Sequence, residues 1–333
     1  MSKPTLQDMV RCATVVSIPL TTPFRNLTHR EAMIFDAPSG PAEWSPFTEY
    51  DDQEASLWLA SALEQGWQPP PPLPPGSATI RVNGTIPAVA ADEVLDLITH
   101  AGFPHTIKVK VAGPGTTLAL DCERVAAVRK ALGPLGRIRL DANGAWGVDE
   151  AEHAIREMEH LDLDYVEQPV TTLADMAEIR SRIKRLGIQV AADESIRRWS
   201  DLDAVIDAQA CDVVVLKVQP LGGISATRKL ISTATGAGLA VVLSSALETS
   251  VGLYPAAILQ AELEASDYSA LDAGLGTAHF LSPDVVTHPL VAHAGSLKLV
   301  HPTLAPDALT ALRASEEREL WWHARLARCW EGL

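Results

Sequence analysis

From residue 78 onward, short apolar segments alternate with amphipathic segments of helix length. The expected strands occupy residues 78–89, 106–112, 137–144, 164–170, 189–195, 212–219, 240–247 and 269–274. Strands that alternate with helices are typical of a parallel sheet, and eight such units in about 200 residues predict a (β/α)8-type barrel. An open doubly wound sheet is the alternative, but such a sheet normally carries a glycine-rich phosphate turn. The sequence contains no GxGxxG and no GxxxxGK[ST] motif.

The segments on either side of this repeat have a different character. Residues 1–78 mix strand-like pieces at 13–20 and 31–38 with a helical stretch at 51–66, and a proline-rich loop follows at 68–76. Residues 315–333 suit a helix with an apolar face. We therefore expect an α+β N-terminal domain at 1–78 and a barrel at 79–280. The C-terminal segment at 281–333 is expected to pack on one of them.

The composition excludes several classes of function. The chain has 42 acidic against 27 basic residues and a net charge of −15, which argues against a nucleic-acid partner. No apolar run approaches the roughly 18 residues of a membrane span, and we expect no membrane partner. The four cysteines are scattered without a CxxC pair, and the N-terminus has no signal-peptide pattern. We therefore expect a cytoplasmic protein with reduced thiols, whose oligomeric state the sequence leaves open.

Charged residues end five successive strands of the repeat. Lys110, Asp141, Glu167, Asp193 and Lys217 follow one another at intervals of 31, 26, 26 and 24 residues. Each interval is about one strand–helix unit, so these side chains are expected at one mouth of the barrel, where such folds place their sites. Three carboxylates packed together need a cation, and hard oxygen donors favour Mg²⁺.

The lysines are expected to flank these acids. Lys108 and Lys110 share one face of their strand because side chains alternate along it. A lysine near a metal and a second cation can have its pKa lowered and can then act as a general base. We interpret Lys110 as this base and Lys108 as the neighbour that tunes it, with Lys217 across the mouth. Asn143 is either a turn residue or a site residue. Glu194 is either a supporting acid or a helix cap.

These residues lie in motifs that resemble the enolase superfamily, in its muconate-lactonizing-enzyme subgroup. The matching pieces are KVK, DANGAW, VEQP, ADES and LKVQPLGG, within residues 79–280. The resemblance implies a modified (β/α)8 barrel with an N-terminal capping domain and a Mg²⁺ cofactor for which Mn²⁺ substitutes. It assigns the base to Lys110 and the opposite lysine to Lys217; sites of this kind pair a lysine base with Mg²⁺. The implied metal ligands are Asp141, Glu167 and Asp193.

Within that subgroup the chain resembles the o-succinylbenzoate synthase family. The resemblance rests on the compact length, on PAEWSPFTEYDDQEAS at 41–56 and on LSSALETSVG at 243–252. It implies that Ser244, Ser245 and Asn143 contact a small-molecule carboxylate substrate. Two features depart from the family pattern: residues 21–31 are not glycine-rich, and Trp44 separates the acid from Ser-Pro.

The family reaction is the syn loss of water from 2-succinyl-6-hydroxy-2,4-cyclohexadiene-1-carboxylate, a step of menaquinone biosynthesis that gives o-succinylbenzoate. A racemase of N-acylamino acids or a dipeptide epimerase on the same scaffold is one alternative. A muconate-type cycloisomerase is another, and a non-catalytic binding protein on a barrel is a third. The binding protein would be expected to lack some ligands or lysines, and this sequence retains all of them.

Overall fold

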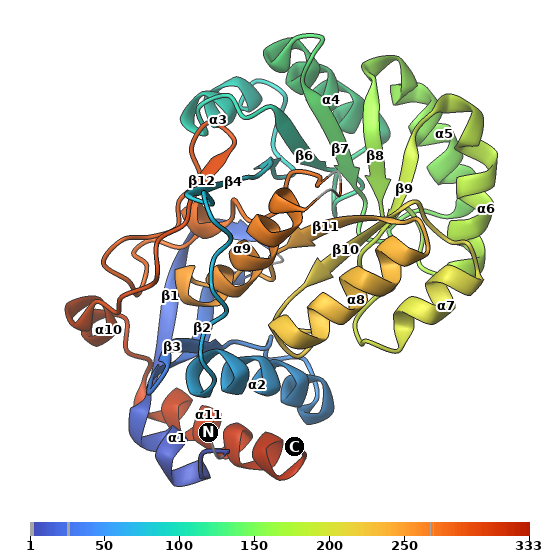
Figure 1. The fold of residues 1–333 in the computed structure, drawn as a ribbon. Coiled ribbons are helices and arrows are strands. Elements are labelled where there is room, and N and C mark those ends of the chain that lie inside the picture. Colours follow the sequence, from blue (N-terminus) through green and yellow to red (C-terminus); the bar gives the residue numbers. More distant parts are fainter. Residues whose placement is uncertain (1–2, 25–26, 267, 269) are drawn as a thin grey trace.

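The computed structural model describes residues 3–24, 27–266, 268 and 270–333. A curved parallel sheet surrounded by helices forms the larger body, and a smaller antiparallel sheet lies beside it (Figure 1). Among the described helices, none has the length and apolar character needed to cross a bilayer.

The N-terminal domain is a three-stranded antiparallel sheet with one helix packed on it. Its sheet has the order β1–β2–β3. The elements are α1 (Leu6–Cys12), β1 (Ala13–Phe24), β2 (Leu27–Ala37), β3 (Gly40–Trp44) and α2 (Asp52–Trp67). The atypical segment 21–31 contributes to β1 and β2, while residues 25–26 lie outside the described residues. The expected strands at 13–20 and 31–38 and the helix near 51–66 are confirmed.

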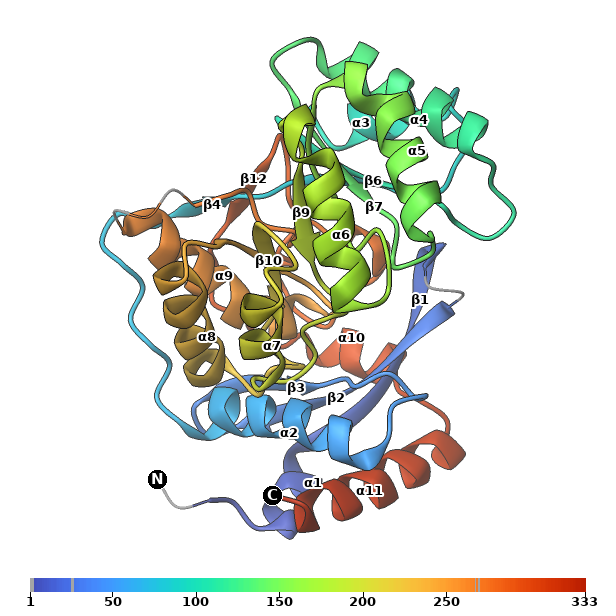
Figure 2. The same ribbon diagram turned by 90° about the vertical axis from the view of Figure 1, so that its right-hand side faces the viewer.

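The C-terminal helix packs against the N-terminal domain. Helix α11 (Glu316–Glu331) lies beside α1 and α2, as both views show (Figures 1 and 2). Trp322 meets Trp44 edge to face at 5.3 Å between ring centroids. Arg325, which is buried, donates to the Tyr50 carbonyl at 2.6 Å. A short helix, α10 (Pro306–Ala311), precedes α11.

Within the described residues, the parallel sheet contains seven strands in the order β5 to β11. The strands are β5 (Gly84–Ile86), β6 (Thr106–Lys110), β7 (Arg137–Asp141), β8 (Leu163–Glu167), β9 (Gln189–Ala192), β10 (Val213–Lys217) and β11 (Ala240–Ser244). The surrounding helices are α3 (Val94–His100), α4 (Leu118–Leu132), α5 (Val148–Met158), α6 (Leu173–Ile183), α7 (Asp201–Asp207), α8 (Ile224–Gly236) and α9 (Ser250–Ala265). The predicted class of fold, a modified (β/α)8 barrel with a second α+β domain, is confirmed.

Two strand predictions at the closing edge of the barrel were wrong in detail. The segment 78–89 divides into β4 (Thr79–Arg81) and β5, because β4 pairs antiparallel with β12 (Ser296–Lys298). The segment 269–274 contributes isolated bridges at Ala273 and Gly274, while residue 269 lies outside the described residues. A Cβ at Gly274 would lie 2.7 Å from the Ser244 Oγ, so this close approach requires glycine.

Side-chain alternation divides the barrel residues into two groups. The outward group packs under the helices as the main hydrophobic core. The inward group includes a small apolar cluster of Tyr165, Ala191, Val213, Val215 and Val242. This cluster shares the barrel interior with the fully buried Arg139, whose guanidinium lies 4.9 Å from the centroid of the Tyr165 ring.

Buried acids lie where the N-terminal domain meets the barrel. Glu43 at the end of β3 is fully buried and accepts hydrogen bonds from the Thr249 and Gly252 amides, at 3.1 and 3.0 Å, at the start of α9. Burial raises the pKa of Glu43. Burial, together with the charge of Glu43, raises the pKa of Glu248 to about 7. At neutral pH these buried acids therefore carry an electrostatic cost that destabilises the interface.

This cost predicts a pH-dependent effect of Glu248→Gln. An unfolded Glu248 has its ordinary pKa of 4.5, so the folded chain holds an extra proton between pH 4.5 and 7 and loses stability as the pH rises through that window. Glu248→Gln removes this penalty, worth on the order of 2 kcal/mol. The gain in free energy of unfolding of Glu248→Gln over wild type should therefore be larger at pH 8 than at pH 5. Urea titrations at the two pH values measure this gain.

The exposed Glu123 on α4 provides the control, because Glu123→Gln removes the same charge from a side chain at the protein surface. An equal difference in free energy of unfolding between Glu248→Gln and wild type at both pH values would contradict the raised pKa of Glu248.

Candidate active site

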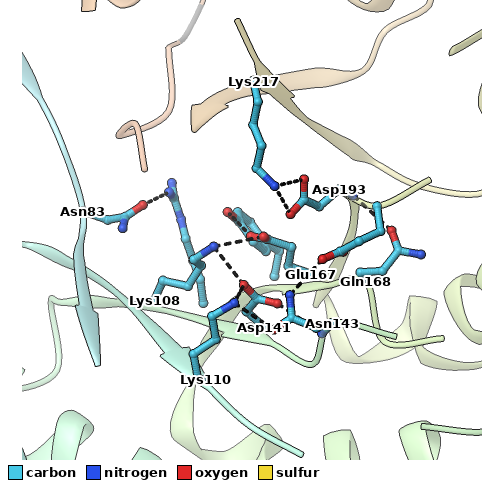
Figure 3. Close-up of polar contacts among 12 residues, drawn as sticks. Asn83, Lys108, Lys110, Asp141, Asn143, Glu167, Gln168, Asp193 and Lys217 are labelled. Atoms are coloured by element: carbon cyan, nitrogen blue, oxygen red, sulfur yellow. Dashed lines mark hydrogen bonds and ion pairs between the residues drawn. The ribbon is translucent and has the colours of Figure 1, made fainter. Parts of the chain in front are cut away.

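The charged strand ends meet at one end of the sheet. Lys110 pairs in register with Asp141, and Asp141 pairs with Glu167 on the next strand. Asp193 follows directly after β9, and Lys217 ends β10. Figure 3 shows Lys217 approaching the carboxylates from one side and the two lysines of β6 from the other. The structure thus brings together the three acids and three lysines that the sequence singled out.

The two lysines of β6 contact two of the acids. The Lys108 Nζ lies 2.9 Å from Asp141 Oδ2 and 3.0 Å from Glu167 Oε1. The Lys110 Nζ lies 2.5 Å from Asp141 Oδ2 and donates to Asn143 Oδ1 at 2.8 Å. The Lys108 side chain is 12% exposed and that of Lys110 is 20% exposed. Lys110 is therefore the member of the pair that lies nearer the open mouth.

On the opposite side, Lys217 binds Asp193 alone. Its Nζ lies 2.6 Å from both carboxylate oxygens of Asp193. Burial lowers the pKa of Lys217, but the charges of Asp193 and Glu194 outweigh burial and the net shift is upward. Lys217 is thus held as a cation.

The charges of the site shift the pKa values of the acids in opposite directions. Burial would raise the pKa of Asp141, but Lys108 and Lys110 hold it well below its usual range. Burial and the charge of Asp141 raise the pKa of Glu167 to about 8. Burial lowers the pKa of Lys108 and is outweighed by Asp141 and Glu167, so this pKa lies well above its ordinary value. Lys108 is therefore held as a cation by its two acidic partners.

Two residues after the strands orient the charged groups. Asn143 has a left-handed backbone (φ 48°) and donates from its amide nitrogen to Glu194 Oε1 at 2.9 Å. Gln168, also left-handed (φ 39°), accepts hydrogen bonds from the Asp193 and Ser195 amides at 3.1 Å. Asn143 thus links Lys110 to Glu194, and Gln168 fixes the turn that carries Asp193.

Glu194 has one oxygen without a partner. The structure brings it into the site rather than to a helix cap, because its side chain lines the same cavity as the lysines. Its Oε2 is buried and has no hydrogen-bond partner among the described residues. Burial and the charge of Asp193 raise the pKa of Glu194.

A cavity of about 640 Å³ opens above these groups. It is lined by all three lysines, by Asp141 and Asp193, and by Ser244 and Ser245 at the end of β11. Ser244 is buried against Gly274, while the Ser245 hydroxyl shares a 2.7 Å hydrogen bond with Thr277.

Sequence reasoning missed several residues of the cavity. Phe47 and Glu49 reach it from the N-terminal domain, and Arg197 reaches it from the loop after β9. Phe47 and Glu49 follow shortly after the Ser45-Pro46 pair. This pair was the sequence signal that could have identified them as cavity residues. Gln168 stands inside the VEQP motif, yet its role depends on a turn geometry that the sequence pattern does not specify.

The donor set of the site suits a hard divalent cation. Asp141, Glu167 and Asp193 are carboxylates from three adjacent strands, and oxygen donors of this kind favour Mg²⁺ or Mn²⁺. Among the described residues that line the cavity there is no His or Cys. In the described residues, the acids form no closed cluster of three or more metal donors. The lysine ammonium groups lie on the carboxylate oxygens instead. The residues fit a cation of this class once these ion pairs open.

Family comparisons agree with this geometry. A model described as "Enolase C-terminal domain-like" matches residues 89–307, and one described as "Enolase N-terminal domain-like" matches residues 15–66. The L-Ala-D/L-Glu epimerase from Bacillus subtilis has the same fold, with a TM-score of 0.73 and 22% identity over 88% of this chain and 96% of its own. The chain belongs to the enolase superfamily.

Curated relatives define a narrower group. The o-succinylbenzoate synthase of Thermobifida fusca (strain YX) is 44% identical over 323 residues, which cover 95% of this chain and 96% of the relative. That of Mycobacterium bovis (strain BCG / Pasteur 1173P2) is 40% identical over 331 residues, covering 99% and 97%. Within the superfamily, the chain belongs to the o-succinylbenzoate synthase family.

Proposed function

We propose that this chain is an o-succinylbenzoate synthase, a hydro-lyase that converts 2-succinyl-6-hydroxy-2,4-cyclohexadiene-1-carboxylate into o-succinylbenzoate for menaquinone biosynthesis. The observation that carries the proposal is the placement of Lys110 and Lys217 on opposite sides of three strand-end carboxylates, beneath a cavity of about 640 Å³. The relatives at 40–44% identity support the same reaction.

The reaction removes a proton and a hydroxide from neighbouring carbons of one ring face. In the proposal, the Lys110 Nζ takes the proton α to the ring carboxylate and then gives it to the leaving hydroxyl, so that water departs and the ring becomes aromatic. A syn elimination needs one base on one face, and Lys110 reaches furthest into the cavity from β6. Asn143 supports this role because its Oδ1 accepts from the same Nζ.

Lys217 stabilises the negative charge that develops after the proton leaves. Its ammonium lies across the site from Lys110 and is held protonated by Asp193 and Glu194. A fixed cation beside a developing anion stabilises the transition state more than the ground state. Lys108 is one layer deeper and balances the charges of Asp141 and Glu167.

The proposed cofactor is Mg²⁺, with Mn²⁺ as a substitute, held by Asp141, Glu167 and Asp193. Bound there, it would supply positive charge that stabilises the substrate carboxylate as electron density grows on it. The buried, mutually repelling acids support this assignment, because the pKa of Glu167 is raised to about 8 by burial and by Asp141. The charged form of such a carboxylate is stabilised most by a second positively charged partner.

The substrate contacts and the domain limits are part of the same proposal. Ser244 and Ser245 line the cavity at the end of β11 and are proposed to bind the succinyl carboxylate, and Asn143 is proposed as a further substrate contact. The division into 1–78, 79–280 and 281–333 stays a prediction. A cytoplasmic location also stays a prediction, and the four free cysteines are compatible with it. No oligomeric state is proposed.

A racemase of N-acylamino acids is the second candidate. The same opposed lysines favour it, because racemisation needs an acid–base group on each face of the substrate. The proposed roles differ at Lys217: it stays protonated in the dehydration and exchanges a proton in the racemisation. This difference makes the two candidates separable by experiment.

The metal assignment predicts that a chelator abolishes dehydration and that Mg²⁺ or Mn²⁺ restores it. Asp193→Asn should lower kcat/KM by about 100-fold or more, since ligand-sphere changes of this kind cost at least that much. Its unfolding midpoint should change little by comparison. Asp212→Asn is the matched control, because Asp212 pairs with Arg180 at 2.8 Å outside the cavity. Full activity in metal-free buffer would exclude the assignment.

The base assignment predicts that Lys110→Ala folds and binds Mg²⁺ in calorimetry but loses about 10²–10⁴-fold in kcat, the usual contribution of a general base. Lys108→Ala should lose less, because the Lys108 Nζ is held between Asp141 and Glu167 and is less exposed than that of Lys110. If Lys110→Ala retains near-normal turnover while Lys108→Ala does not, the base is the other member of the pair.

The role of Lys217 predicts that Lys217→Arg, which keeps the positive charge, retains more dehydration than Lys217→Ala. The larger planar guanidinium reduces the rate relative to wild type. For a racemase both variants would be equally inactive in one direction. Incubation of wild type with N-succinylamino acids in D₂O gives an independent readout. Deuterium entering both enantiomers as fast as dehydration proceeds would favour the racemase.

A further inference from the structure

The apolar wall of the cavity is built by two loops that meet across the domain boundary. Phe47 comes from the loop after β3, and Ala246 and Leu247 come from the loop after β11; all three line the cavity. We call these three residues the two-loop wall. Its position decides where a flat ring can lie relative to Lys110.

Arg30 on β2 binds both loops at once. It is 3% exposed, and its Nε donates to the Leu247 carbonyl at 3.1 Å. Its Nη2 reaches the Ala246 carbonyl at 3.4 Å and also donates to the Ser45 carbonyl in the other loop. One buried guanidinium thus holds carbonyl groups of both loops.

The same guanidinium also holds an aromatic side chain of the wall. The Arg30 Cζ lies 4.3 Å from the centroid of the Phe47 ring, a distance at which cation and ring attract each other. Arg30 therefore contacts one member of the two-loop wall through its side chain and the other two through their carbonyls.

Leu247 needs such an anchor. Its backbone is left-handed (φ 64°), a conformation that branched, bulky residues rarely adopt. Such strained residues persist where surrounding contacts over-determine them, and they cluster at ligand-binding positions. The Leu247 carbonyl is held by Arg30, and the neighbouring Ala246 amide donates to Glu248 Oε2 at 2.6 Å.

We propose that Arg30 is a positioning residue that sets substrate affinity. It holds the two-loop wall where the wall meets the ring of a cyclic dicarboxylate, while the proton chemistry stays with Lys110 on the far side of the cavity. The inference rests on the proposed function and deepens it. It makes a residue of the N-terminal domain, remote from the metal ligands, a determinant of which rings the site accepts.

The test uses Arg30→Lys, which keeps the charge. A lysine ammonium cannot bind separated carbonyls as a planar fork does, and it stacks less well on a ring. We expect KM to rise about ten-fold or more while kcat stays within about three-fold, because losing a contact made equally in the ground and transition states raises KM without changing kcat. Calorimetric affinity for o-succinylbenzoate should fall by the same factor as KM rises.

Arg318→Lys is the matched control. Arg318 binds Glu31, the neighbour of Arg30 in sequence, at 2.6 Å between Nη2 and Oε2, on the side of the domain that faces α11. It perturbs the same strand without touching the cavity, so its KM should equal that of wild type. An unchanged KM in folded Arg30→Lys, or equal KM changes in both variants, would overturn the proposal.

Hydrogen exchange gives a readout that does not depend on turnover. In Arg30→Lys, the amides of residues 245–249 should exchange at least about ten-fold faster than in Arg318→Lys, since they lose their anchor. If wild type proves inactive on the cyclohexadiene substrate, the proposed function fails, yet this exchange result still decides whether Arg30 positions the loop. Equal exchange in the two variants would refute the positioning role.

Discussion

The ion pairs between inward-facing lysines and strand-end carboxylates are the interaction on which the rest of the site depends. Lys108 and Lys110 alternate with apolar residues, so both enter the barrel rather than the outer core. Lys110, Asp141 and Glu167 lie at the same level because their strands pair in register, while Lys217 reaches Asp193 through a 2.6 Å ion pair. Each buried charge alone would destabilise the fold because it loses its hydration. The ion pairs offset this desolvation cost without strongly stabilising the fold.

Sequence periodicity predicted the barrel, the three acids and the lysines, because these follow from strand spacing and side-chain alternation. The closing edge was predicted less well. Segment 269–274 makes only isolated bridges in its described part, and β4 leaves the barrel to pair with β12. Such pairings depend on distant partners that local patterns do not identify. The roles of Arg30 and Gln168 were not predicted for the same reason. They depend on carbonyl and amide groups that only the fold brings close.

The second domain has a chemical role as well as a structural one. Glu43 fixes the start of α9, Arg30 holds the loop before it, and Phe47 faces the cavity. In the proposed function, the barrel supplies the reacting groups, while the N-terminal domain shapes the space above them.

A crystal structure of the wild-type chain with Mg²⁺ and o-succinylbenzoate tests the central assignment most directly. We expect Mg²⁺ on Asp141, Glu167 and Asp193, the lysine ammonium groups displaced from those oxygens, and the ring between Lys110 and Lys217. Mg²⁺ bound elsewhere, or both lysines on the same face of the ring, would contradict the assignment of base, cation and metal ligands together.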